Sequence, residues 1–149
     1  MTVREAWLSD VDNIAPLFNA YRMFYEQPSD LNGAKVWIRD NMTLKRATLF
    51  VYQESDELLG FTQLYPAFCS VEMKPFYVLY DVYVDPTARQ RGVASRLLRH
   101  AHEWAKTQGA SRVDLETAHT NVTAQSVYEA LGYVLDSEFR KYSFDTSSL

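Results

Sequence analysis

The chain of 149 residues has one cysteine, Cys69, and no long apolar run. A lone cysteine cannot form a disulfide within the chain, so a reducing compartment is the simplest location. We interpret Cys69 as a small buried hydrophobe and not as a nucleophile. No apolar stretch approaches the roughly 20 residues that cross a bilayer, and the start "MTVREAWLSD" lacks the pattern of a signal peptide. We therefore expect a cytoplasmic protein with no membrane contact.

Several well-known functional motifs are also missing. The sequence contains no G-x-x-x-x-G-K-[ST], no G-x-G-x-x-G, no H-E-x-x-H, no G-x-S-x-G and no cysteine cluster. His100 and His102 are two residues apart in a predicted helix, so they face different sides and cannot chelate together. These absences argue against a P-loop, a dinucleotide fold, a serine hydrolase and a metal site. The net charge of −4 argues against a nucleic-acid partner, which needs a basic face.

What is present is typical of one globular domain, residues 1–149, with 47% apolar and 23% charged residues. Hydrophobic periodicity and turn residues predict alternating strands and helices in a mixed α/β (α+β) fold. We expect a largely antiparallel sheet of about six to seven strands, about four helices on its two faces, and one parallel crossover. The predicted strands are 3–7, a hairpin at 47–68, 76–84, 112–118 and a final pair at 133–144; the predicted helices begin at Ser9 and cover 34–42, 92–107 and 123–132.

The stretch "DVYVDPTARQRGVASRLL", from Asp81 to Leu98, places an apolar strand directly before a helix. One interpretation is a simple turn whose arginines are solvated. The other is an anion site, because the free amides at a helix start bind phosphate. Gly92 and Ala94 would let a ligand approach the backbone closely, while Arg89 and Arg91 would add positive charge.

Two motifs in this chain resemble those of the GNAT N-acetyltransferases. Arg89-x-x-Gly92-x-Ala94 is similar to that family's acyl-CoA pyrophosphate loop. About thirty residues downstream, "NVTAQSVYEALGY" (Asn121 to Tyr133) is similar to its N-x-x-A-x-x-x-Y-x-x-x-G-F/Y segment. The predicted element order and length also agree. The resemblance implies a three-layer fold and transfer of an acetyl group from acetyl-CoA to an amine, with no metal.

The resemblance also assigns the donor site. The amides of the loop would hold the pyrophosphate, the preceding strand would pair with the pantetheine arm, and the downstream motif would lie near that arm. The residues so implied are Val82, Tyr83, Val84, Arg89, Gln90, Arg91, Gly92, Val93, Ala94, Ser95, Asn121, Ala124 and Tyr128. The Val82 amide would polarise the thioester carbonyl.

Tyr128 is the candidate general acid. A phenol with an ordinary pKa near 10 stays protonated above the pKa of a thiol, near 8.5, and can donate to a departing sulfur. Asn121 lies about two helical turns earlier, so both side chains can face one groove. Without the surrounding motif, Tyr128 would be read as a core aromatic and Asn121 as a helix cap.

The general base is left open among three residues. Polyamine-acetylating members of the family often carry a glutamate at the position that Tyr80 occupies here. The candidates are Asp81, Glu116 and His119, and a mechanism without a dedicated base is a further alternative. Asp81 adjoins Tyr80, but neighbouring strand residues point to opposite faces.

An aromatic-rich set is expected near the acceptor. Tyr21, Tyr25 and Tyr65 could line an amine site through cation–π contacts, whereas Phe24 and Phe68 are expected in the core. The expected acceptor is a small amine such as a polyamine, diamine or amino acid. A protein lysine or N-terminus, and a non-catalytic acyl-CoA-binding module, are the alternatives. The resemblance further implies a homodimer.

Overall fold

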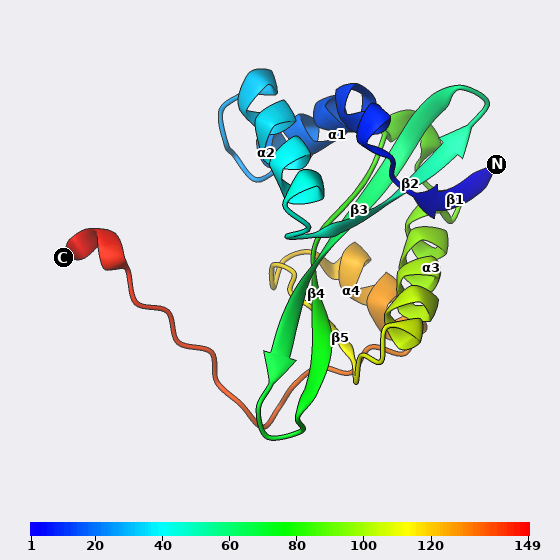
Figure 1. Cartoon of the computed structure of the whole chain (residues 1–149). Coiled ribbons are helices and arrows are strands. Elements are labelled where there is room, and N and C mark those ends of the chain that lie inside the picture. The colour runs from blue at the N-terminus through cyan, green and yellow to red at the C-terminus, as the bar shows by residue number, and fades with distance from the viewer. The chain divides into compact units, whose positions relative to one another are not determined.

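The computed structural model describes all 149 residues, which form two compact units, residues 1–116 and 117–149. The first unit holds one five-stranded sheet in the order β1-β2-β3-β4-β5 (Figure 1). Its strands are β1 (Thr2–Glu5), β2 (Thr48–Glu54), β3 (Glu57–Cys69), β4 (Lys74–Val84) and β5 (Val113–Leu115). Its α-helices are α1 (Val11–Phe24), α2 (Leu31–Thr43) and α3 (Val93–Thr107). No helix of the protein is both long and apolar enough to cross a bilayer.

The sheet topology follows from the length of the connections. Strands β1 to β4 pair antiparallel with their neighbours, and a two-residue turn joins β2 to β3. Strand β5 pairs parallel with β4, which requires a crossover, and α3 supplies it. The predicted mixed, largely antiparallel sheet with one parallel crossover is confirmed.

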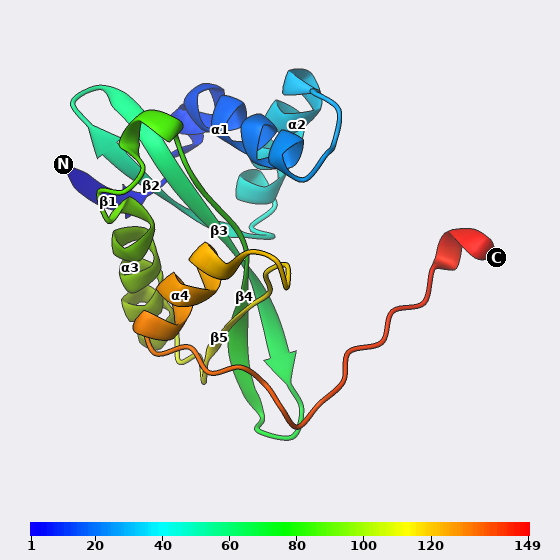
Figure 2. The same ribbon diagram turned by 180° about the vertical axis from the view of Figure 1, so that it is seen from behind.

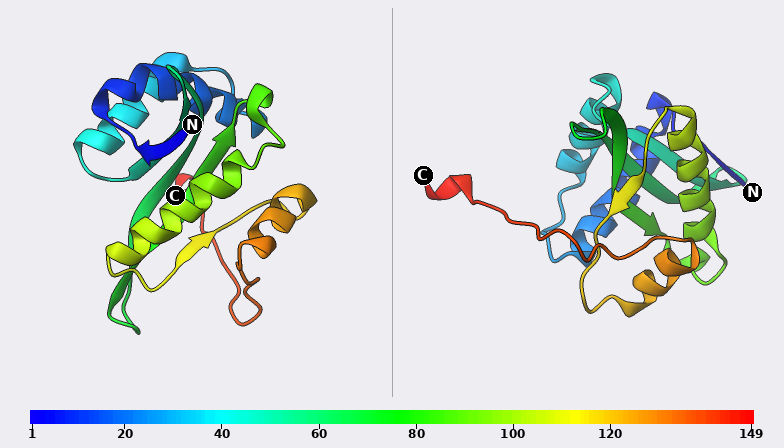
Figure 3. Two further views of the ribbon diagram at one scale, coloured as in Figure 1. Left: turned by 90° about the vertical axis from the view of Figure 1, so that its right-hand side faces the viewer. Right: turned by 90° about the horizontal axis from the view of Figure 1, so that it is seen from below.

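Helices cover both faces of this sheet (Figure 3). On one face, Val11 and Ile14 of α1 pack with Val51 of β2 and Phe61 of β3 in the main core cluster. On the other face Phe50 contacts the aromatic side chains of α3, with ring centroids 4.9 Å from His100 and 5.5 Å from Trp104. Because successive strand residues face opposite ways, β2 is apolar on both sides.

The start of α1 differs from the expected one at Ser9. A short 3-10 turn, Leu8–Asp10, precedes the helix, and Asp10 makes the stabilising contacts. Its carboxylate accepts from the Trp7 amide at 2.6 Å and from both terminal nitrogens of Arg4, at 2.8 and 3.0 Å. The Arg4 hydrogen bonds hold the pKa of Asp10 below its ordinary value. This pairing links β1 to the turn that precedes α1.

The second unit contains the helix α4 (Val122–Ala130) and a 3-10 turn, Thr146–Ser148. The strand pair predicted at 133–144 was wrong, so the sheet has five strands rather than six to seven. Asp136 accepts from the amides of Glu138 and Phe139, which turns the chain in the middle of the segment. Its apolar side chains are exposed, and an isolated hairpin with no covered face is at best marginally stable.

Candidate active site

Strand β4 changes its pairing partners half way along its length. Its register with β3 steps from Gln63↔Asp81 to Leu64↔Leu79, which leaves Tyr80 as an extra, bulged residue. Strand β5 pairs only with Tyr77–Leu79 (Figure 2). From Tyr80 to Val84 the edge of β4 away from β3 therefore has no paired strand. Its backbone groups can bind an extended ligand as an added strand would.

The loop that leads from β4 into α3 holds its backbone in an unusual conformation. Gly92 caps the helix at φ 75°, and Gln90 has φ 60°. A Cβ on Gly92 would meet nothing within 4 Å, so it is the left-handed backbone that requires glycine there. The first helical bond runs from the Arg96 amide to the Gly92 carbonyl, at 3.1 Å. The amides before it have no helical partner and can bind an anion.

Both loop arginines bind other groups of the first unit, to which the loop itself belongs. Arg89 donates to the Val84 carbonyl at 3.0 Å and lies over the Tyr83 ring. Arg91 forms an ion pair with Glu54, at the end of β2. Exposed ion pairs contribute little to stability, so Arg91 can exchange Glu54 for an incoming phosphate at small cost.

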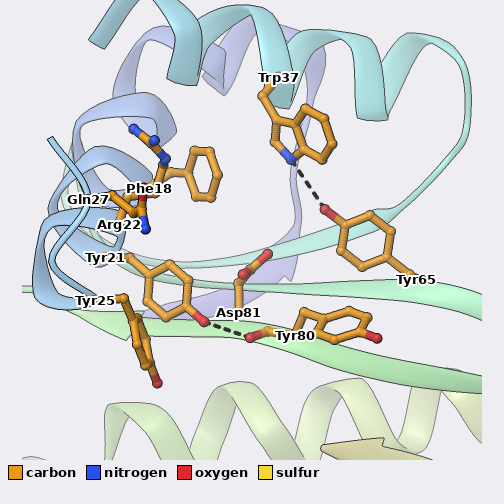
Figure 4. A pocket seen from close by; sticks show the side chains of 9 residues that line it. All are labelled: Phe18, Tyr21, Arg22, Tyr25, Gln27, Trp37, Tyr65, Tyr80 and Asp81. Atoms are coloured by element: carbon orange, nitrogen blue, oxygen red, sulfur yellow. Dashed lines mark hydrogen bonds between the residues drawn. The ribbon is translucent and has the colours of Figure 1, made fainter. Parts of the chain in front are cut away.

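A pocket of about 440 Å³ opens between α1, α2 and strands β3 and β4 (Figure 4). That volume falls within the range of small-molecule sites. Most of its wall is aromatic. Its lining residues are Phe18, Tyr21, Arg22, Tyr25, Gln27, Trp37, Tyr65, Tyr80 and Asp81.

Asp81 provides the only carboxylate in this lining. Asp81 is 8% exposed, whereas the adjacent Tyr80 is 52% exposed. The Gln63 amide donates to Asp81 Oδ2 at 2.5 Å. Burial raises the pKa of Asp81 to about 6, against the opposing effect of hydrogen bonding from Gln63 and Tyr21. Asp81 is thus ionised at neutral pH but close to its titration, as a general base should be.

The three tyrosines expected at the acceptor site do line one pocket. The rings of Tyr21 and Tyr25 lie 5.1 Å apart, and the Tyr21 hydroxyl donates to the Tyr80 carbonyl at 2.7 Å. Tyr65 lies on the opposite wall, with its hydroxyl 3.3 Å from the indole nitrogen of Trp37 (Figure 4). Burial raises the pKa of Tyr65 above its ordinary value.

The expectation that Phe24 and Phe68 lie in the core was wrong. Phe24 is 63% exposed at the end of α1, and Phe68 is 80% exposed near the tip of the β3–β4 hairpin. Trp37 and Arg22 line the pocket without having been expected there. For Trp37 a signal existed, because Val36, Trp37 and Ile38 are consecutive in a helix and cannot all face the core.

In the second unit, the predicted short helix is present as α4, which contains Ala124 and Tyr128. Asn121 caps the helix, accepting from the Ala124 amide at 3.2 Å. Tyr128 is half-buried, with its ring 5.8 Å from that of Tyr133. The roles assigned to these two residues stay predictions. Glu116 and His119 are both exposed, whereas Asp81 is buried.

Comparison with known proteins gives a consistent result. The model of the Acetyltransferase (GNAT) family matches residues 14–133, a range that includes parts of both units. An uncharacterised N-acetyltransferase of Bacillus subtilis, YhfO, is 44% identical over 142 residues, covering 95% of each chain. A crystal structure of a probable acetyltransferase superposes with a TM-score of 0.92 at 37% identity, covering 97% of each chain. An aminoglycoside N(6')-acetyltransferase type 1 of Serratia marcescens is 37% identical over 62 residues, 42% of each chain.

The raised pKa of Asp81 predicts a pH-dependent stability change in Asp81→Asn. The native carboxyl titrates at about 6 rather than 3.8, so the wild type loses stability as the pH rises through this window. The variant lacks that loss. Urea unfolding gives the free energy of unfolding of each protein. The value for Asp81→Asn minus that for the wild type should be about 1 kcal/mol more positive at pH 8 than at pH 5. An advantage that does not change with pH would contradict this ionisation behaviour.

Proposed function

The chain belongs to the GNAT acetyltransferase family and is an N-acetyltransferase, and we propose that its acceptor is a small-molecule amine bound over Asp81. The observation that carries the proposal is the pocket itself, a buried carboxylate surrounded by aromatic rings. Aromatic faces attract an ammonium group, and a carboxylate can then remove its proton. Asp81 also lies on the strand whose open edge begins at Tyr80.

The donor in this family is acetyl-CoA, which supplies the acetyl group as a thioester. Residues of this chain fit such a ligand at two places. The amides of Gln90–Ser95, with Gly92 at φ 75°, would hold the pyrophosphate, flanked by Arg89 and Arg91. The open edge at Val82–Val84 would hydrogen-bond the pantetheine arm. The family motif assigns Asn121 and Ala124 to the same ligand.

We assign the proton steps to two side chains. Asp81 takes a proton from the bound ammonium, leaving a neutral nitrogen with the lone pair that forms the new amide bond. Its pKa of about 6 suits this exchange at neutral pH. Tyr128 gives its proton to the departing sulfur, and bulk water restores it. Glu116 and His119 remain weaker candidates for the base, because both are exposed.

The charges of the pocket favour a particular class of amine. Its lining has one carboxylate, Asp81, and one cation, Arg22. A polyamine or an aminoglycoside carries several positive charges, and Arg22 would repel those that Asp81 does not neutralise. A monoamine with an apolar body, or an amino acid whose carboxylate reaches Arg22, fits better. The Serratia relative is named for aminoglycosides, but the shared segment is only 62 residues long.

The proposal is tested by incubating the purified protein with acetyl-CoA and an amine panel, and detecting N-acetyl products by mass spectrometry. The panel contains phenylethylamine, phenylalanine, spermidine, kanamycin and a lysine peptide. We expect acetylation of the first two above the others, because each presents one ammonium beside an apolar body. Preferential acetylation of the peptide or of a polycation would overturn the proposed acceptor class.

Tyr128→Phe separates catalysis from simple binding in the same assay. Loss of a general acid lowers kcat by about a hundredfold or more, and the acetyl-CoA affinity should not change. An unchanged kcat would remove Tyr128 from the mechanism. Acetyl-CoA binding by a wild-type protein that acetylates nothing in the panel would favour a non-catalytic module.

The donor site is tested with a pair of glycine substitutions at the two ends of α3. Gly92→Asp puts a negative charge and backbone strain at the proposed pyrophosphate site, and we expect acetyl-CoA affinity to fall at least about tenfold. Gly109→Asp is the matched control, because Gly109 is also exposed with φ 77° but follows the end of the helix. Calorimetric titration measures both. Equal losses in the two variants would show a general effect on folding and contradict the assignment.

A further inference from the structure

A row of hydrogen-bonded side chains leads from the surface to Asp81. Arg46, in the turn after α2, donates from Nε to Asn41 Oδ1 at 3.0 Å. Asn41 Nδ2 donates to Gln63 Oε1 at 2.9 Å, and Gln63 Nε2 donates to Asp81 Oδ2 at 2.5 Å. Asn41 and Gln63 are 1% and 0% exposed, so water cannot replace these bonds easily. None of Arg46, Asn41 and Gln63 lines the pocket.

The chemistry of the two ends fixes the direction of this row. A guanidinium can only donate and an ionised carboxylate can only accept. Each amide in between must accept on its oxygen and donate from its nitrogen, and only one orientation of Asn41 and Gln63 satisfies both ends. Arg46 and Asp81 together therefore fix the orientation in which Gln63 presents its NH₂ group, and not its oxygen, to Asp81.

We propose that Arg46, acting through Asn41 and Gln63, positions Asp81 so that Oδ2 stays a hydrogen-bond acceptor and the carboxylate is held ready to take the proton of the amine. The assignment of the proton to an acceptor amine rests on the proposed function, whereas the positioning does not. In Figure 4 the carboxylate points into the space between the aromatic rings.

A substitution at Arg46 should act on Asp81 from a distance. Without the guanidinium, the Asn41 amide is free to turn over, and Gln63 can follow with its oxygen toward Asp81. Two facing oxygens repel, which disfavours the ionised carboxylate and raises its pKa. Asn41 Nδ2 also donates to the Tyr65 hydroxyl at 3.0 Å, so the inverted amide would present an acceptor to that hydroxyl.

Few other groups can account for such a shift. No second carboxylate lines the pocket, and Arg22 is its one cation. The ionisable or charged side chains that line it with Asp81 are Tyr21, Arg22 and Tyr25 from α1, Tyr65 from β3 and Tyr80 from β4. Substitutions at Gln63, Arg46 and Arg39 leave all of these side chains in place.

The test follows the Asp81 carboxyl by carbon-detected NMR over a pH titration of the folded protein, with the signal assigned by its loss in Asp81→Asn. Gln63→Met removes the last donor, and we expect the Asp81 pKa to rise by about one unit. Arg46→Met should raise it in the same direction by a smaller amount. Arg46→Lys keeps a donor-only cation and should restore the wild-type value. Arg39→Met, a loss of positive charge at an exposed position of α2, is the matched control and should produce no shift.

The outcomes separate this inference from the proposed function. An Asp81 pKa that is the same in wild type, Gln63→Met and Arg46→Met overturns the positioning role. Equal shifts in Arg46→Met and Arg39→Met also overturn it, because they reflect net charge alone. The expected shifts in a wild-type protein that acetylates no amine would support the positioning and count against the proposed function.

Discussion

The site depends on one carboxylate that is buried among aromatic rings and held by an amide instead of a cation. Removing a carboxylate from water disfavours its charged form, and a strong ion pair would reverse that effect. Asp81 receives a hydrogen bond from Gln63, which offsets only part of the burial. The resulting pKa of about 6 leaves the group charged at neutral pH and still able to accept a proton. An arginine placed directly against it would have produced a weaker base.

The bulge in β4 connects the acceptor pocket to the donor side. An extra residue at Tyr80 steps the register with β3, and the pairing with β5 ends at Leu79. The same short segment therefore places Asp81 in the pocket and exposes the strand edge at Val82–Val84. From there the chain passes through the glycine-capped loop into α3. Acceptor, thioester and pyrophosphate sites are thus proposed along one continuous stretch of sequence.

The parts of the site that depend on local patterns could be predicted from the sequence. The loop from Arg89 to Ala94, the helix that follows it and the cap at Asn121 are all defined by residues close together in the chain. Tyr21, Tyr25 and Tyr65 could be assigned to one site because their segments resemble a family pattern. The structure brings them together around Asp81.

What could not be predicted depends on contacts between distant elements. Whether Asp81 faces the pocket depends on a bulge, and no local signal marks it. The partners of Asp81 come from two separate segments, with Asn41 and Arg46 at and just after the end of α2 and Gln63 in β3, and each alone is an ordinary polar residue. The strand pair expected at 133–144 failed for a related reason. Its alternating pattern specifies a strand only where a partner covers its apolar face, and those side chains are exposed.

The most direct test of the central claim is the pH dependence of kcat/KM for acetylation of the preferred amine, compared in wild type and Asp81→Asn. This ratio reports the ionisations of the free enzyme and free substrate. The account predicts that log kcat/KM of the wild type rises with pH up to a bend near 6, where Asp81 becomes ionised. Asp81→Asn should be slower throughout and lack that bend, keeping only the ionisation of the amine itself. A bend near pH 6 that persists in Asp81→Asn would show that another group is the base.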